Sequence, residues 1–235
     1  MPGFQLLPGE PIIIVGPMGS GKSKLVTFLC EDSGSVVIID SKRHQDEWAE
    51  WGPKHGYVVT SDPADISRHP KVVWQVDVHT LLDVQGFQKP GRPGYLWTDG
   101  LLRIMRRGNT KVVFDELVQQ LPAGHPHPSA VQILTQCGAY GITPIGCSQY
   151  ANRVETMIVR GAVHAFCYRL QPFDAAEIEK KRGIALPSEP PLPPYGFHYH
   201  RTNTDQWVAC QPVPLDDWYV RQSAAAATPA QPAGQ

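Results

Sequence analysis

The sequence predicts an α/β fold with a mostly parallel central sheet flanked by helices and a C-terminal β-hairpin. Short, continuously apolar runs such as Ile12–Val15 and Ser35–Asp40 are typical of strands buried on both faces. Helical patterns lie between these runs, as expected for strand–helix–strand units. The first run leads directly into a Gly-rich segment and a helix, an order that is typical of phosphate-binding loops.

The first half of the chain is expected to contain five strands. They are placed at Ile12–Val15, Ser35–Asp40, Tyr57–Thr60, Val72–Val76 and Lys111–Glu116. The helices expected between them cover 21–30, about 44–51, and 98–107 with Thr98 as the N-cap. Residues 83–95 contain too many Gly and Pro residues for a regular element, and 121–128 form a second, Pro-rich loop.

The second half alternates in the same way. Helices are expected over 129–140, 152–161 and 173–182, and strands over 142–147 and 162–170. A hairpin is expected to pair 196–200 with 206–211. The domain therefore spans 1–222, with a core at about 10–182 and the hairpin at about 195–212. The Ala- and Pro-rich tail, 223–235, is expected to be disordered.

Composition limits the classes of function. The chain has 235 residues and a formal net charge of −1, so no global basic field indicates nucleic acid. DNA stays possible as a partner because a ring of subunits can concentrate a few cations in its pore. The five scattered cysteines form no C-x-x-C pair, which predicts buried thiols in a reducing compartment. We expect no signal peptide and no membrane span.

Residues 16–23 fit the pattern G-x-x-x-x-G-K-[ST] of a phosphate-binding loop. Glycines let the main chain bring several N–H groups close to a triphosphate, and the following helix adds the positive end of its dipole. Lys22 is expected to reach the β- and γ-phosphates, and the Ser23 hydroxyl to help hold Mg²⁺. The residues expected to bind ATP are Gly16, Pro17, Met18, Gly19, Ser20, Gly21, Lys22, Ser23 and, from a later strand, Asp115.

Two further strand ends carry polar residues suited to ATP hydrolysis. Asp115, on a strand expected beside the phosphate loop, is predicted to hold the Mg²⁺ shell together with Ser23. The adjacent Glu116 is placed to polarise an attacking water molecule. Gln149 ends the next strand, where a neutral amide can bond the γ-phosphate or the water.

A charge-stabilising arginine is also expected, either in the same subunit or from a neighbour. The sequence alone does not choose among the candidates Arg103, Arg106, Arg107, Arg153, Arg160 and Arg169.

Other polar segments have more than one interpretation. Asp40 and Lys42 follow a strand end, so they lie either near the site, at a subunit contact or in a solvated turn. Lys89 and Arg92, with Phe87 and Tyr95, lie on a loop that can contact a nucleic-acid backbone, although an ordinary surface loop is favoured. His125 and His127 are of a residue type that binds metals, but no further ligands are spaced nearby, so a solvated loop is favoured.

The chain resembles the FtsK–HerA superfamily of DNA-pumping ATPases, and most of all the genome-packaging ATPases of membrane-containing icosahedral viruses. The resemblance covers about residues 10–182. It rests on the phosphate loop 16–23, the Asp40-Ser41-Lys42 strand end, Val112–Glu116 and Ile145–Gln149. It implies a RecA-like P-loop NTPase domain that forms a ring, a hexamer or pentamer. Many relatives carry arginines before the glutamine strand, where this chain has 135–140 without arginine, and this favours Arg160 or the Arg106–Arg107 pair.

The resemblance implies an ATP-hydrolysing translocase that moves double-stranded DNA into a viral capsid. Its implied partners are DNA and capsid-vertex or membrane-associated virion proteins, in the host cytoplasm and at the packaging vertex of the virion. A small-molecule kinase is one alternative, although no acceptor pocket or Arg-rich lid is evident. A non-hydrolysing ATP-binding virion assembly protein is another. A relative that drives filamentous-phage extrusion would normally need a membrane segment.

Overall fold

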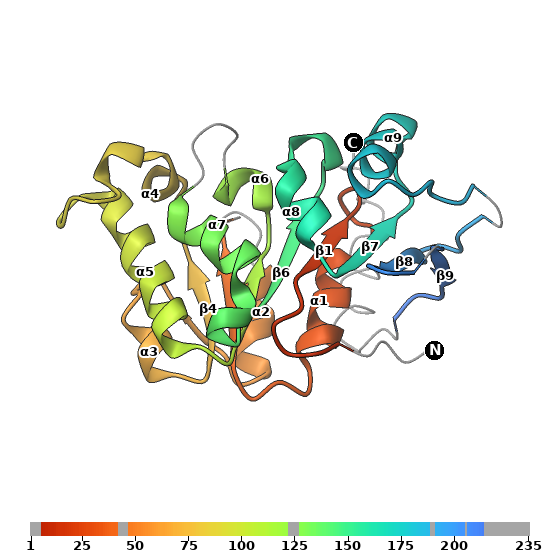
Figure 1. The fold of residues 1–235 in the computed structure, drawn as a ribbon. Helices are drawn as coiled ribbons and strands as arrows, with labels where there is room; N and C mark the ends of the chain where they lie inside the picture. The colour runs from red at the N-terminus through yellow and green to blue at the C-terminus, as the bar shows by residue number, and fades with distance from the viewer. Residues whose placement is uncertain (1–5, 42–46, 122–126, 189–190, 205, 214–235) are drawn as a thin grey trace, which may run out of the picture.

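The computed structural model describes residues 6–41, 47–121, 127–188, 191–204 and 206–213. Lys42, His125 and the predicted tail lie outside these ranges. One nine-stranded sheet runs through the molecule in the order β3-β4-β2-β5-β6-β1-β7-β8-β9 (Figure 1). The strands are β1 (Ile12–Val15), β2 (Val36–Asp40), β3 (Val58–Thr60), β4 (Lys71–Gln75), β5 (Lys111–Phe114), β6 (Thr143–Ser148), β7 (His164–Tyr168), β8 (Phe197–Arg201) and β9 (Val208–Cys210).

The first seven strands are parallel, and β8 and β9 extend the sheet as an antiparallel hairpin. This confirms the predicted fold class and hairpin. The strands are connected by α1 (Lys22–Cys30), α2 (Glu47–Lys54), α3 (Asp65–Arg68), α4 (Val78–Leu82), η1 (Val84–Gly86), α5 (Pro93–Arg107), α6 (Leu117–Gln120), α7 (Pro128–Thr135), η2 (Cys137–Tyr140), η3 (Ala151–Arg153), α8 (Thr156–Gly161) and α9 (Pro172–Arg182).

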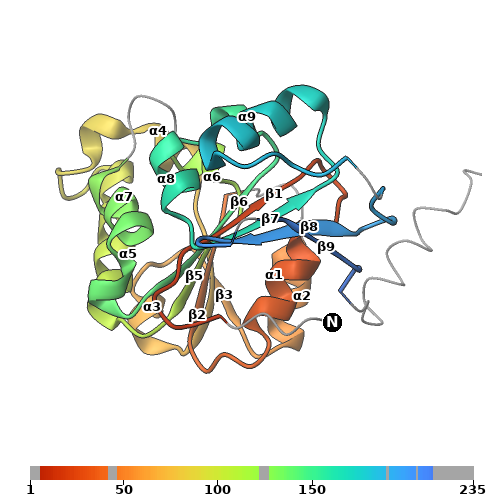
Figure 2. The same cartoon turned by 45° about the vertical axis from the view of Figure 1, so that its right-hand side comes forward.

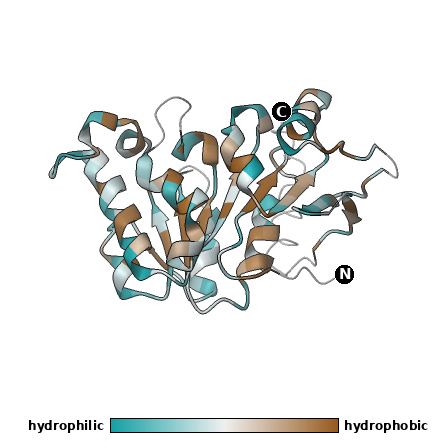
Figure 3. Ribbon diagram, in the orientation of Figure 1, coloured by the Kyte–Doolittle hydropathy of each residue, from teal (hydrophilic) through white to brown (hydrophobic). Residues whose placement is uncertain are grey.

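Helices cover both faces of the sheet, which explains why the central strands are apolar throughout. In β1, Ile12 and Ile14 face the cluster formed with α1 and α2, whereas Ile13 and Val15 face the cluster formed with α5, α7 and α8. The two groups of helices lie on opposite sides of the sheet in Figure 2, and the strands between them are hydrophobic in Figure 3. All five cysteines are buried, as predicted. No helix among the described residues is long and apolar enough to cross a membrane.

The segment from 77 to 107 is more regular than its composition predicts. Helix α5 begins at Pro93, so Thr98 lies inside it and is not the N-cap. The Thr98 hydroxyl instead donates to the Phe87 carbonyl, 2.5 Å away. A proline at the first turn is compatible with a helix because its missing N–H would have no helical partner there. The short helices α3, α4 and α6 were also not predicted, because elements of four or five residues carry little periodicity.

At the edge of the sheet where the parallel strands begin, a polar cluster connects the hairpin to the parallel strands. Glu10, just before β1, accepts hydrogen bonds from His164 on β7 (2.7 Å) and from Arg201 on β8 (2.9 Å). Burial opposes ionisation of Glu10, but bonds from the Leu7 N–H, His164 and Arg201 outweigh it and lower its pKa to about 2. Burial lowers the pKa of His164, which favours the neutral form of its ring beside the carboxylate.

Replacing Glu10 with Gln is expected to lower the free energy of unfolding at pH 7 by about 2 kcal/mol, because two charge-assisted bonds are weakened. The folded pKa lies below the ordinary value of 4.5, so this contribution is present above pH 4.5 and is lost as the pH falls towards 2. Urea unfolding between pH 7 and pH 3 measures it. The exposed control Glu31→Gln should change stability little. A Glu10→Gln variant with the wild-type pH dependence would contradict this account.

Candidate phosphate-binding site

The phosphate loop, the two carboxylates and Gln149 follow three strands that lie side by side. Strand β6 pairs with β1 on one side and with β5 on the other. In register, Val15 lies opposite Ser148, and Phe114 lies opposite Gly146, so all three strands end at the same edge of the sheet. Neighbouring strands are about 4.8 Å apart, so the tips of β1 and β5 are separated by about 10 Å across the sheet.

One part of the predicted arrangement is wrong. The carboxylate strand β5 is not directly beside the phosphate-loop strand β1, because the glutamine strand β6 lies between them. Gln149 therefore follows the middle strand, between the phosphate loop and the Asp115–Glu116 pair. Apolar runs indicate that strands are buried but carry no information on their lateral order.

The loop after β1 has the backbone that its glycines predict. Gly19 and Gly21 have positive φ angles of 74° and 99°, and Gly21 is the N-cap of α1. The Lys22 ammonium donates to the carbonyls of Gly16 (2.7 Å) and Pro17 (2.9 Å), which places its charge over the loop. The first turn of α1 contains no acidic residue. Its N–H groups and dipole therefore favour an anion at this position.

Tyr168, at the end of β7, packs against the phosphate loop on the side away from β6. This contact was not predicted from the sequence. Its hydroxyl donates to the Gly21 carbonyl at 2.9 Å. A Cβ placed on Gly16 would lie 2.7 Å from both the Tyr168 Cβ and the Ser20 Oγ, so only glycine fits without a shift. The pairing of β7 with β1 brings Tyr168 here, and the local sequence gives no signal of that pairing.

The carboxylates are buried at the tips of adjacent strands. Asp115 and Glu116 follow β5 and are 2 % and 4 % exposed, and Asp40 at the end of β2 is 1 % exposed. Asp40 is buried rather than in a solvated turn, and its strand is next to the carboxylate strand β5 but three strands from the phosphate-loop strand β1. Gln120 on α6 supports this edge, because its amide donates to the Ile39 carbonyl at 2.8 Å and to the Ser41 hydroxyl at 3.2 Å.

Gln149 lies on a short turn closed by Ser148. The Ser148 hydroxyl donates to the Tyr150 carbonyl (3.1 Å) and accepts from the Tyr150 N–H (3.2 Å). The next residues are held by α9: the buried Lys181 ammonium donates to the carbonyls of Ala151 and Val154, both at 2.7 Å. The turn that carries Gln149 is therefore fixed from both ends.

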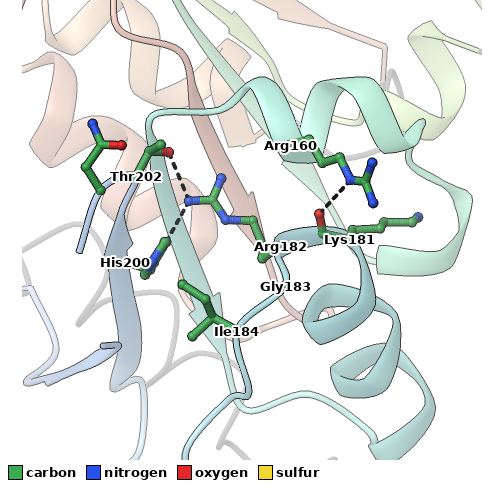
Figure 4. Close-up of a pocket in the computed structure, with 8 residues that line it drawn as sticks. Arg160, Lys181, Arg182, Gly183, Ile184, His200 and Thr202 are labelled. Carbon is green, nitrogen blue, oxygen red and sulfur yellow. Dashed lines mark hydrogen bonds between the residues drawn. The ribbon is translucent and has the colours of Figure 1, made fainter. Parts of the chain in front are cut away.

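Arg160 lies far from the loop of its own subunit. It lies in the last turn of α8, just before β7 begins, whereas the phosphate loop follows the other end of the parallel strand β1. The five residues of β7 span about 15 Å between these edges. The Arg160 side chain donates to the Lys181 carbonyl at 3.2 Å (Figure 4). It lines a cavity of about 370 Å³ with Arg182, His200 and Thr202. From this position Arg160 does not reach the phosphate loop of its own chain.

The other arginines divide into structural and edge residues. Arg107 lies at the amino ends of the strands and donates to the carbonyls of Ile66 and His69, both at 2.9 Å, so its role is structural. Arg103 pairs with Asp99 within α5 at 2.8 Å. Arg153 and Arg169, in contrast, are exposed and follow the carboxyl ends of β6 and β7, the edge that carries the phosphate loop.

The two loops considered for other roles are partly structural. Phe87 is only 8 % exposed and packs within the fold, whereas Arg92 stays at the surface and is paired with Asp83 at 2.8 Å. His127 is buried and accepts the Ser129 N–H at the start of α7, and burial lowers its pKa to about 4. Its position favours a structural cap over a metal ligand. The described part of the chain contains no cluster of potential metal ligands.

Solved structures with the same fold include a viral genome-packaging NTPase. The genome-packaging NTPase B204 from Sulfolobus turreted icosahedral virus 2, in complex with sulfate, is 20 % identical with a TM-score of 0.68, covering 88 % of this chain and 98 % of that one. VirB4 of Thermoanaerobacter pseudethanolicus is 11 % identical with a TM-score of 0.64, covering 89 % and 91 %. The chain has the P-loop NTPase fold of these structures. No protein-family model and no curated protein sequence matches it.

The closeness of Gly16 to Tyr168 can be tested without any ligand. We expect Gly16→Ala to lower the free energy of unfolding by about 1–3 kcal/mol, because the added methyl group overlaps Tyr168 and Ser20. Gly34→Ala is the matched control, because a Cβ at Gly34 meets nothing within 4 Å. Urea unfolding of the two variants makes the comparison. Equal stability of the two variants would contradict the packing described here.

Proposed function

We propose that this chain is an ATP-hydrolysing DNA translocase that packages double-stranded DNA into a viral capsid. The observation that carries the proposal is the alignment of three strand tips, β5, β6 and β1, at one edge of the sheet. They bring Glu116, Gln149 and the phosphate loop to neighbouring positions. The likeness in fold to a viral genome-packaging NTPase supports the same assignment.

The residues at this edge fit a Mg²⁺–ATP complex. Hard oxygen donors are the preferred ligands of Mg²⁺, and the Ser23 hydroxyl and Asp115 carboxylate are donors of this kind. The loop N–H groups, the α1 dipole and Lys22 supply positive charge for the phosphates. Bound Mg²⁺ would neutralise charge that develops on the β- and γ-phosphate oxygens.

The chain's own residues have separate roles in hydrolysis. Glu116 accepts a proton from the attacking water, and Gln149, directly after the strand between β5 and β1, orients that water against the γ-phosphate. Lys22 stays on the β- and γ-phosphates as charge shifts to the leaving oxygen. Burial of Glu116 keeps its carboxylate in a fixed position rather than on a mobile surface side chain.

Oligomer assembly completes the proposal. An arginine near the γ-phosphate would come from the neighbouring subunit of a hexameric or pentameric ring, and Arg160 is the candidate carried by the resemblance. Arg153 and Arg169 compete with it because they lie at the phosphate edge. The ring would surround DNA and dock on capsid-vertex or membrane-associated virion proteins, in the host cytoplasm and then in the virion.

Glu116→Gln is expected to retain ATP binding and to lower the hydrolysis rate at least about 100-fold, because the isosteric amide cannot accept the water proton. ATP binding and phosphate release to water are the measurements. Glu50→Gln, an exposed change on α2, is the matched control and should hydrolyse ATP as the wild type does. Phosphate transferred to a small molecule would indicate a kinase. A wild type that binds ATP but never hydrolyses it, even with DNA and assembled rings, would indicate an assembly protein.

Lys89 offers a test of DNA contact. It is exposed on the 83–95 loop, and Arg92 on the same loop is already paired with Asp83. Lys89→Glu is expected to lower DNA-stimulated ATP hydrolysis several-fold and to leave basal hydrolysis unchanged, because a phosphate contact becomes a repulsion. Lys54→Glu, at the end of α2, is the matched charge reversal and should have little effect. Equal stimulation in both variants would remove the 83–95 loop as a DNA contact.

A further inference from the structure

Tyr195 has a backbone conformation that tyrosine rarely adopts. Its φ angle is +59°, in the left-handed region. The Gly196 N–H donates to the Pro193 carbonyl at 2.9 Å and closes a four-residue turn, with Pro194 at the second position and Tyr195 at the third. This is the pattern of a type II turn, whose third position favours glycine because L side chains are strained there. Glycine at position 195 would therefore strain the backbone of this turn less than tyrosine does.

The Tyr195 ring is exposed beside the phosphate loop. Strand β8 begins at Phe197, and Phe197 pairs with Tyr168 at the end of β7, so Tyr195 lies at the edge of the sheet that carries the loop. A Cβ built on Gly21 would lie 3.7 Å from the Tyr195 Cδ1 and 3.6 Å from the Tyr168 hydroxyl. Tyr168 is buried, whereas Tyr195 is 54 % exposed and can offer its ring to a ligand.

The direction in which a nucleotide lies follows from the order of the strands. Glu116 and Gln149 follow β5 and β6, on one side of β1, and the terminal phosphate must face them. Tyr195 precedes β8, on the opposite side of β1 beyond β7. A triphosphate that places its γ-phosphate towards β6 extends its nucleoside away from β6, towards β7 and β8. The exposed ring of Tyr195 lies on that path.

We propose that Tyr195 is the platform on which the nucleobase of the bound nucleoside triphosphate stacks. The inference rests on the proposed nucleotide site and adds the part of it that holds the base. The Pro193–Gly196 turn fixes the backbone of Tyr195, and a tyrosine side chain has only two χ angles to immobilise on binding. An aromatic face contributes to binding every base by stacking and does not itself read the base edge. Tyr195 therefore contributes affinity for the nucleoside part of the ligand and none for its phosphates.

Binding of two probes to Tyr195→Gly tests this proposal. Glycine keeps the turn and removes the ring, so the melting temperature should be at least that of the wild type. The variant should bind a non-hydrolysable ATP analogue at least about ten-fold more weakly, as expected when a base loses an aromatic partner. It should bind inorganic tripolyphosphate, which has no base, with wild-type affinity. Tyr195→Phe restores the ring and should restore affinity for the analogue.

The outcomes separate this inference from the proposed function. Unchanged affinity of Tyr195→Gly for the ATP analogue overturns the role of Tyr195. Equal loss of affinity for both probes also overturns it, because the ring would then support the phosphate loop rather than the base. Lys22→Ala should weaken binding of both probes. A wild type that binds neither probe would instead contradict the proposed nucleotide site.

Discussion

The pairing of β6 with both β1 and β5 is the constraint on which the rest of the site depends. The Gly16 N–H donates to the Ser148 carbonyl at 3.1 Å, so the first residue of the phosphate loop is bonded to the residue before Gln149. On the other side of β6, Phe114 lies opposite Gly146, and this register determines where along the strand direction Asp115 and Glu116 lie. A shift of either register by one residue would turn these side chains to the other face of the sheet. The relative positions of the loop, Gln149 and the carboxylates therefore depend on backbone hydrogen bonds between these strands.

The register is maintained because the strands are covered on both faces. A parallel sheet exposed to water would lose the apolar burial that stabilises it, and the two hydrophobic clusters prevent this. Gly146 illustrates how closely the layers fit, because a Cβ there would lie 2.7 Å from a methyl group of Leu117. Leu117 opens α6 directly after Glu116, so helix packing also determines where the chain turns after the carboxylates.

The two edges of the sheet differ in how they use charge. At the amino edge, cations are bonded to backbone carbonyls: Arg107 holds the chain between α3 and β4, and Arg182 donates to the carbonyls of Val159 and Ala162. At the carboxyl edge, buried carboxylates lie near the N-terminus of α1 and its lysine. Lys22 and Lys181 also donate to backbone carbonyls in the phosphate loop and just after β6, so the two edges differ in their buried carboxylates rather than in their cations.

The sequence by itself determined the elements whose signals are local. Glycines at 16, 19 and 21 and the apolar run before them predict the loop and its strand, because backbone freedom and periodicity are properties of a few consecutive residues. The roles proposed for Lys22, Glu116 and Gln149 also came from the sequence and stay predictions. Only the tertiary structure decided the position of β6, the structural role of Arg107, and the approach of Tyr168 and Tyr195 to the loop. These depend on contacts between segments far apart in the chain, and lateral strand order leaves no mark on the residues of any single strand.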